Sequence, residues 1–275
     1  MAQTLDIERL DESEVPAMLA LSAEAGWNQT EDDWCIFLQQ GRVFACRGET
    51  GGRPVATAAI LPYGNFAWIS MVLVTASWRQ KGLGTHLLRH CIAELQTLGC
   101  VPYLDATPAG ENVYLPLGFQ PVFGITRWQG QGAMQDSGKA AAAVPGDLAA
   151  CLKLDAASFG FAREPLLRSF TARKPELAML KDGGFVVARS GRLATQIGPL
   201  AAPDETVALD LLRHALDRVG GPVFLDVPDR WTMLGDELRA RGFTVQRGFR
   251  RMALGTSVSN GDPGRSFVLA GPEFG

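Results

Sequence analysis

Hydrophobic positions recur with two spacings along the chain, one typical of strands and one typical of helices. The segment 66–74, FAWISMVLV, is apolar at both alternating sets of positions. A strand of this kind is covered on both faces, so it is predicted to lie in the centre of its sheet. The residues after Gly84 are apolar at helical spacing and stop at Gly99, which predicts one amphipathic helix. Its apolar positions are Leu87, Leu88, Cys91, Ile92, Leu95 and Leu98.

Further helices and strands alternate along the rest of the chain, which indicates an α/β fold. Helices are expected at about 11–25, after Thr30, and at 113–117, 148–157, 165–171, 207–219 and 231–241. Strands are expected at 5–10, 42–47, 54–64, 101–106, 119–128, 185–189, 192–200, 223–227, 243–254 and 266–270.

The two halves of the chain repeat one pattern. The segment YLDATP…LPLGFQPV of the first half corresponds to FLDVPD…LRARGFTVQ of the second, so that Asp105 matches Asp226. Two copies of one α/β unit are the simplest explanation. Between them, 129–147 is rich in Gly, Ala and Ser and is interpreted as a linker. The predicted domains are 1–130 and 147–275, with 131–146 joining them.

Composition restricts the classes of function. The 275 residues carry a net charge of −3, which argues against a general nucleic-acid binder. Five cysteines without CxxC spacing indicate reduced thiols in a cytoplasmic protein, and three histidines argue against a His-rich metal site. No run approaches the ~18 apolar residues of a membrane helix, and no membrane partner is expected.

The sequence RQKGLG (79–84) stands where the central strand gives way to the amphipathic helix. The start of a helix leaves backbone N–H groups unpaired and carries a partial positive charge. Gly82 and Gly84 would let an anion approach these groups, and Arg79 and Lys81 would add positive charge. The pattern lacks GxGxxG and the Walker lysine, so neither a Rossmann nor a kinase site is indicated. A tight strand–helix turn without a ligand is the alternative.

This loop resembles the pyrophosphate loop of the GNAT (GCN5-related N-acetyltransferase) superfamily, Q/R-x-x-G-x-G/A, which 79–84 matches in full. YLPLGF (114–119) matches the Tyr-x-x-x-Gly-Phe segment of the same family. The resemblance covers residues 5–130, and the second half looks like the companion domain of tandem-GNAT bacterial acetyltransferases. It implies two GNAT-like domains, each with a mixed, mostly antiparallel central sheet flanked by helices.

The resemblance implies a single acyl-CoA site, in the first domain. The second copy is degenerate, because Asp204 and Glu205 stand at its loop position and would repel a pyrophosphate. In the first domain the backbone of Val72, Leu73 and Val74 is expected to pair with the pantetheine arm of acetyl-CoA. The pyrophosphate is expected at Arg79, Gln80, Lys81, Gly82, Leu83, Gly84 and Thr85.

The resemblance also implies catalytic and acceptor groups. Tyr114 stands at the family's position for the acid that protonates the CoA thiolate, although a packed aromatic ring is the alternative. Trp27 and Asn28 lie in the segment that lines the acceptor pocket in this family. The asparagine that this family has near the start of its last helix is absent here, and Thr107 stands at about that position. Strand 66–74 has no Glu, so the base is unassigned and water is a candidate. The recurrence of Asp105 as Asp226 favours a structural role for both.

The expected function is a cytoplasmic, acyl-CoA-dependent N-acetyltransferase. It would transfer acetyl from acetyl-CoA to a primary amine of a small molecule by direct attack, without metal or nucleic acid, as a monomer or homodimer. One alternative is a non-catalytic acyl-CoA-binding or sensing protein. The other is an interaction module in which both halves are degenerate.

Overall fold

The computed structural model describes residues 5–48, 51–134, 144–145 and 147–275. The chain forms two compact units. Unit 1 comprises residues 1–104 and Phe274, and unit 2 comprises 105–273 and Gly275.

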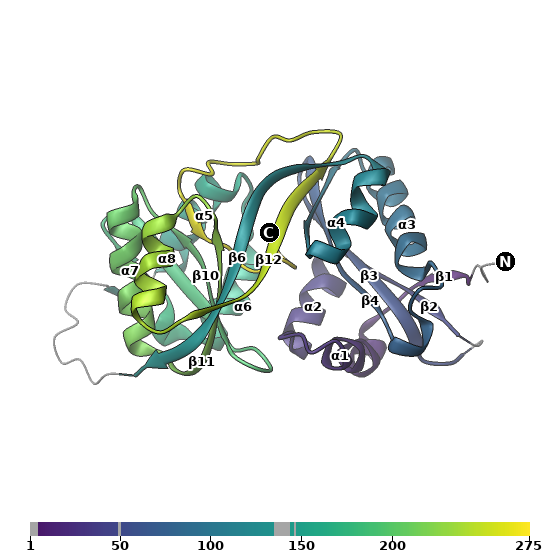
Figure 1. The fold of residues 1–275 in the computed structure, drawn as a ribbon, viewed down its shortest axis with the longest axis horizontal. Coiled ribbons are helices and arrows are strands. Elements are labelled where there is room, and N and C mark those ends of the chain that lie inside the picture. The colour runs from purple at the N-terminus through teal and green to yellow at the C-terminus, as the bar shows by residue number, and fades with distance from the viewer. Residues whose placement is uncertain (1–4, 49–50, 135–143, 146) are drawn as a thin grey trace. The chain divides into compact units, whose positions relative to one another are not determined.

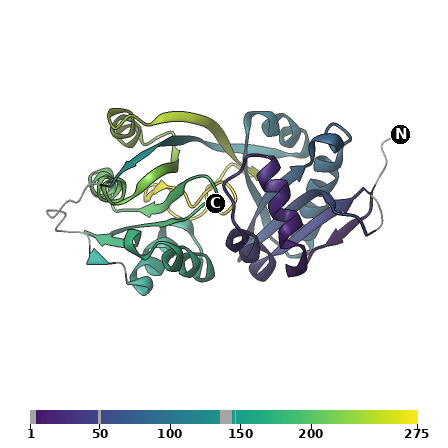
Figure 2. The same ribbon diagram turned by 90° about the horizontal axis from the view of Figure 1, so that it is seen from below.

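Unit 1 is a sheet with helices on both faces (Figures 1 and 2). Its strands are β1 (Ile7–Arg9), β2 (Arg42–Arg47), β3 (Pro54–Tyr63), β4 (Phe66–Val74) and β5 (Val101–Ala106), the last two residues of which belong to unit 2. Its helices are α1 (Val15–Glu24), α2 (Glu31–Gln40) and α3 (Leu83–Thr97). The strands lie in the order β1-β2-β3-β4-β5, and only β4 and β5 run parallel.

The prediction for the central strand is confirmed. β4 lies between β3 and β5, and all its residues from Phe66 to Met71 are buried. Helices α1 and α2 cover one face of the sheet and α3 covers the other (Figure 2). The predicted amphipathic helix is α3, although Leu98, placed on its apolar face, is 43% exposed. Leu98 is the C-cap of α3 and lies one residue beyond the last helical position.

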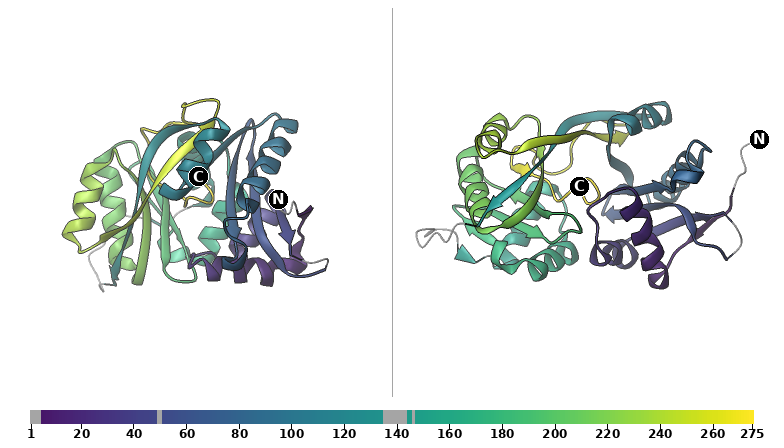
Figure 3. Two further views of the ribbon diagram at one scale, coloured as in Figure 1. Left: turned by 45° about the vertical axis from the view of Figure 1, so that its right-hand side comes forward. Right: turned by 60° about the horizontal axis from the view of Figure 1, so that its bottom comes forward.

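The strands of unit 2 are of mixed direction and lie in the order β12-β6-β11-β10-β9-β8-β7, with β13 beside β10. Its strands are β6 (Phe119–Ala133), β7 (Val144–Pro145), β8 (Met179–Lys181), β9 (Gly184–Arg189), β10 (Thr195–Ala201), β11 (Gly220–Pro228), β12 (Thr244–Leu254) and β13 (Ser266–Val268). Its helices are α4 (Pro108–Tyr114), α5 (Leu148–Phe159), α6 (Glu164–Arg173), α7 (Glu205–Arg218) and α8 (Thr232–Ala240). The long strands β6 and β12 run side by side (Figure 3).

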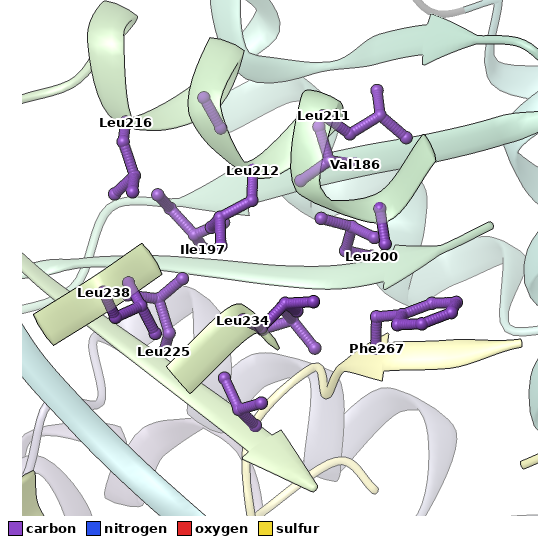
Figure 4. Packing of buried hydrophobic residues seen from close by; sticks show 14 of the residues in the cluster. Val186, Ile197, Leu200, Leu211, Leu212, Leu216, Leu225, Leu234, Leu238 and Phe267 are labelled. Atoms are coloured by element: carbon purple, nitrogen blue, oxygen red, sulfur yellow. The ribbon is translucent and has the colours of Figure 1, made fainter. Parts of the chain in front are cut away.

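The core of unit 2 lies between its sheet and helices α7 and α8 (Figure 4). One face of α7 is buried, because Leu211, Leu212 and Leu216 pack into this core. Phe267 of β13 packs beside Leu200 and Leu234 in the same cluster.

The predicted linker starts too early. Residues 129–133 belong to β6 and pair with β11, whereas 135–143 and 146 lie outside the described residues. The glycines there serve close packing. A Cβ at Gly130 would lie 2.5 Å from the ring of Phe243, and one at Gly132 would lie 2.2 Å from the carbonyl oxygen of Val219.

Asp105 and Asp226 each form a buried, bidentate ion pair within unit 2. Asp226 accepts hydrogen bonds from Arg127 at 2.8 and 2.7 Å, and Asp105 accepts from Arg251 at 2.8 and 2.9 Å. Burial raises the pKa of Asp105 above its usual value, while the Arg251 guanidinium opposes this shift. Both carboxylates are thus engaged with arginines from the long strands, in agreement with the shared structural role predicted for them.

Candidate active site

A β-bulge interrupts the central strand of unit 1. Thr57 of β3 pairs with Leu73 and Ala59 pairs with Ser70, so β4 carries one more residue than β3 between these pairs. Met71 has φ 52°, a left-handed conformation that is strained for a residue with a side chain. The hydroxyl of Thr57 donates a hydrogen bond of 3.0 Å to the carbonyl of Met71 and holds this backbone in place. Sequence reasoning missed the bulge, because no glycine marks it.

Beside the bulge, β4 separates from β5. The two strands pair at Phe66–Val101, Ala67–Pro102 and Trp68–Tyr103, and no pair beyond these joins them within the described residues. The later part of β4, including Val72, Leu73 and Val74, therefore faces β5 without a backbone ladder. An extended molecule can add to such an opening as a strand would, through main-chain hydrogen bonds.

The β4–α3 loop ends in a helix start with unpaired donors. Gly82 is the N-cap of α3 at φ 83°, and Gln80 is also left-handed at φ 62°. The first helical hydrogen bond runs from the N–H of His86 to the carbonyl of Gly82, at 2.9 Å. Within the described residues, the N–H groups of 80–85 have no acceptor on the protein. Unpaired amides at the positive end of a helix form an anion site.

Gly84 and two cations complete this loop. A Cβ at Gly84 would lie 3.8 Å from the methyl groups of both Val72 and Val74, so the helix start lies over the end of β4. Arg79 donates from Nε to the carbonyl of Val74 at 3.1 Å, and Lys81 lies with Nζ 4.3 Å from the centroid of the Trp78 ring. Both side chains are exposed, so their charge is available to an anion at the amides.

Tyr114 is the last residue of α4, in unit 2. Its ring folds back over Gly110, where a Cβ would lie 3.0 Å from the Cε2 atom of Tyr114. The ring centroid lies 6.0 Å from that of Phe119. The hydroxyl has no hydrogen-bond partner among the residues that the structure describes, and burial raises its pKa above the usual value. The phenol is therefore protonated at neutral pH, as an acid must be.

The predicted short helix at 113–117 is helical in the structure but belongs to a segment that begins earlier. α4 starts at Pro108, because the hydroxyl of Thr107 caps the helix by accepting a hydrogen bond of 3.2 Å from the N–H of Gly110. The chain then forms a 3₁₀ turn over Leu115–Leu117, where Pro116 stands, and leaves it at Gly118 with φ 94°.

Comparison with known proteins agrees with this geometry. The model of the acetyltransferase (GNAT) family matches residues 7–119, and the model of an acetyltransferase (GNAT) domain matches 151–267. The chain belongs to the GNAT family. It carries two GNAT domains in tandem and is an acyltransferase with N-acetyltransferase activity.

Relatives cover nearly the whole chain. An uncharacterized N-acetyltransferase of Bacillus subtilis (strain 168), YitH, is 25% identical over 86% of this chain and 87% of its own. A putative acetyltransferase from Pyrococcus horikoshii has a TM-score of 0.82 at 19% identity, over 98% of this chain and 96% of that one. A tandem GNAT protein from the clavulanic acid biosynthesis pathway has a TM-score of 0.58 at 14% identity, over 91% and 98%. These two structures show the shared fold, and the tandem arrangement predicted from the repeat is confirmed.

Trp27 and Asn28, which were predicted to line an acceptor pocket, lie in the connection between α1 and α2. Trp27 is half-buried and Asn28 is buried. Next to them, Thr30 and Asp33 form the capping box of α2, which confirms the helix predicted to begin after Thr30. The amide oxygen of Gln29 is buried without a hydrogen-bond partner in the described part of the chain. Sequence reasoning did not single out Gln29, since burial of one polar atom leaves no local pattern.

All five cysteines are free thiols, and no group of three or more His, Cys, Asp or Glu side chains in the described residues is arranged to hold a metal ion. Among the same residues, no helix is long and apolar enough to cross a membrane.

Glu24, which sequence reasoning did not identify, fastens the loop of the GNAT domain to α1. Its carboxylate accepts from the N–H of Ala76 at 2.7 Å and from the hydroxyl of Thr75 at 2.8 Å. The hydrogen bond from the N–H of Ala76 is the main cause that lowers the pKa of Glu24, and the hydrogen bond from the Thr75 hydroxyl lowers it further. The contact joins residues about fifty positions apart, so no local sequence pattern predicts it.

Replacing Glu24 with Ala is expected to weaken acetyl-CoA binding by roughly tenfold, because the loop loses a charge-assisted contact at its start. Glu24→Gln keeps an acceptor oxygen and should retain most of the affinity. Titration calorimetry measures both, with Glu31→Ala, an exposed carboxylate on α2, as the matched control. Since the pKa of Glu24 is lowered, the contact is complete at neutral pH and is lost only as the pH falls through that value. Equal affinities for all variants would contradict this role.

Proposed function

We propose that this protein transfers the acetyl group of acetyl-CoA to a primary amine of a small molecule. GNAT acetyltransferases use acetyl-CoA as co-substrate. The observation that carries the proposal is the row of unpaired N–H groups at 80–85, placed at the end of the strand that separates from β5. The amides, with Arg79 and Lys81, would hold the diphosphate. The open edge of β4 at Val72, Leu73 and Val74 would pair with the pantetheine arm.

The chemistry is direct attack on the thioester. The amine nitrogen bonds to the carbonyl carbon, the C–S bond then breaks, and the electron pair leaves with the CoA sulfur. The sulfur takes a proton from an acid, and the new amide nitrogen gives one up. Tyr114, whose phenol is protonated at neutral pH, is the proposed donor of the proton to the thiolate. No carboxylate stands in β4, so water is the proposed acceptor of the amine proton.

Two measurements test this proposal. Calorimetry with acetyl-CoA tests binding, and release of free CoA thiol in the presence of an amine library tests turnover. Binding with turnover supports the transferase. Binding without turnover for any primary amine favours the sensing protein. Absence of binding favours an interaction module with two degenerate halves.

Tyr114→Phe is expected to lower kcat by about 100-fold while acetyl-CoA affinity stays unchanged, because only the acid is removed. Tyr63→Phe is the matched control, since the Tyr63 hydroxyl donates to the carbonyl of Phe274 and has no place in the chemistry. Steady-state kinetics over a range of pH values report the result. An unchanged kcat at every pH would assign Tyr114 to packing alone.

A further inference from the structure

The second domain repeats the strand geometry of the first at the corresponding place. β10 and β11 pair in parallel at Thr195–Val223, Gln196–Phe224 and Ile197–Leu225, and no further pair joins them within the described residues. β10 also carries one residue more than β9 between Ile197 and Leu200. Both features, the short parallel ladder and the additional residue, match those of β4. The second domain therefore has the same opening between two strands.

Residues of the same chain fill this opening. In β13, Val268 pairs with Leu200 and Ser266 pairs with Ala201. Because β9 occupies the other edge of β10, β13 lies on the edge that faces β11. On the far side, the N–H of Leu269 donates to the carbonyl of Asp226 in β11 at 2.9 Å. The chain thus bridges the two separated strands through its own main chain.

Side chains hold β13 firmly in the opening. Phe267 and Val268 are completely buried in the core of unit 2 (Figure 4). The indole N–H of Trp231 donates to the carbonyl of Ser266 at 2.7 Å, and its ring centroid lies 4.1 Å from that of Phe267. A Cβ at Gly198 would lie 2.1 Å from the carbonyl oxygen of Leu269, so backbone packs against backbone at the additional residue of β10.

The helix start next to this opening also differs from that of α3. Asp204 caps α7 by accepting from the N–H of Val207 at 3.0 Å, and Glu205 occupies the first turn. One donor is therefore used by the protein, and two carboxylates stand where a diphosphate would bring further negative charge. This end of α7 therefore offers an anion fewer donors than the start of α3 does.

We propose that residues 265–269 are a built-in occupant of the second acyl-CoA-type opening, bound by strand addition in place of a pantetheine arm. The chain then binds one acyl-CoA, in the first domain, and the second domain serves as a closed structural copy. The statement about the first domain rests on the proposed function, whereas the occupation of the second opening stands on the contacts of β13.

Hydrogen exchange and calorimetry on the full chain test this inference together. The amides of 266–269 should exchange as slowly as those of β10, and acetyl-CoA should not change their rate. Acetyl-CoA should bind with a stoichiometry of about one. Trp231→Phe removes the indole donor to Ser266 and should speed exchange in 266–269 with the stoichiometry unchanged. Arg168→Met is the control, since Arg168 is exposed on α6, where it pairs with Glu164, and its loss should leave these amides protected.

A stoichiometry of two, or faster exchange at 266–269 on addition of acetyl-CoA, would overturn the inference. Fast exchange of these amides without ligand would overturn it as well. No binding at all, with 266–269 still protected, would instead refute the proposed function of the first domain and support the occupied second opening. The two failures are thus distinguishable.

Discussion

Gly84→Glu is expected to abolish binding of acetyl-CoA, with an affinity loss of at least roughly 100-fold. The backbone at this position tolerates a side chain, because a Cβ meets only the methyl groups of Val72 and Val74, both at 3.8 Å. A carboxylate there would stand at the helix start, beside the unpaired amides of 80–85, where the diphosphate is proposed to bind. It would compete for these donors and repel the diphosphate.

Thermal denaturation with and without acetyl-CoA measures this effect. A ligand that binds only the folded state adds about 2.7 kcal/mol of stability at about 100 times Kd, and the Gly84→Glu variant should lose this gain entirely. Gly84→Ala is the matched control, since a methyl group at 3.8 Å from its neighbours is in ordinary contact and should leave most of the affinity. A full ligand-induced shift in the Glu variant would exclude the loop as the diphosphate site.

Local patterns allowed much of the first domain to be predicted. Residues 66–99 contain all the patterns needed: the apolar pattern on both faces of β4, the glycines after it and the amphipathic period of α3. Each depends on neighbours in sequence, through helix capping, strand burial and backbone conformation. The repeat of Asp105 and Gly118 in the second half gave the tandem arrangement in the same way.

Features that depend on distant segments could not be predicted. The bulge at Met71 is held by Thr57 from another strand, and Glu24 reaches the loop from α1. The glycines of 129–133 indicated a flexible linker, whereas Gly130 and Gly132 allow Phe243 and Val219 to approach β6. Composition alone cannot distinguish a glycine that makes the backbone flexible from one that allows a neighbouring residue to pack closely against the backbone. The last strand was predicted at 266–270, but its place between β10 and β11 depends on backbone pairing with these distant strands, which the sequence does not show.

A large loss of stability is expected when the ion pair between Arg127 and Asp226 is broken. Arg127 is 7% exposed and Asp226 is 1% exposed, and Gln196 adds a hydrogen bond of 2.8 Å to the same carboxylate. Arg127→Met leaves a buried carboxylate with one neutral donor. The free energy of unfolding should fall by about 3–5 kcal/mol, because the remaining charge loses its compensation. Denaturant titration followed by circular dichroism measures the change.

Two control variants separate the lost charge from lost packing. Arg168→Met removes an exposed partner of Glu164 on α6 and should change the free energy of unfolding by about 1 kcal/mol or less. The double variant Arg127→Met, Asp226→Leu removes both charges and should recover much of the stability, since an apolar pair of similar volume can replace a buried ion pair. If the double variant is instead less stable than Arg127→Met, the loss comes from packing along β6 and β11. In that case the arginine stem, and not the uncompensated carboxylate, is what these two strands require.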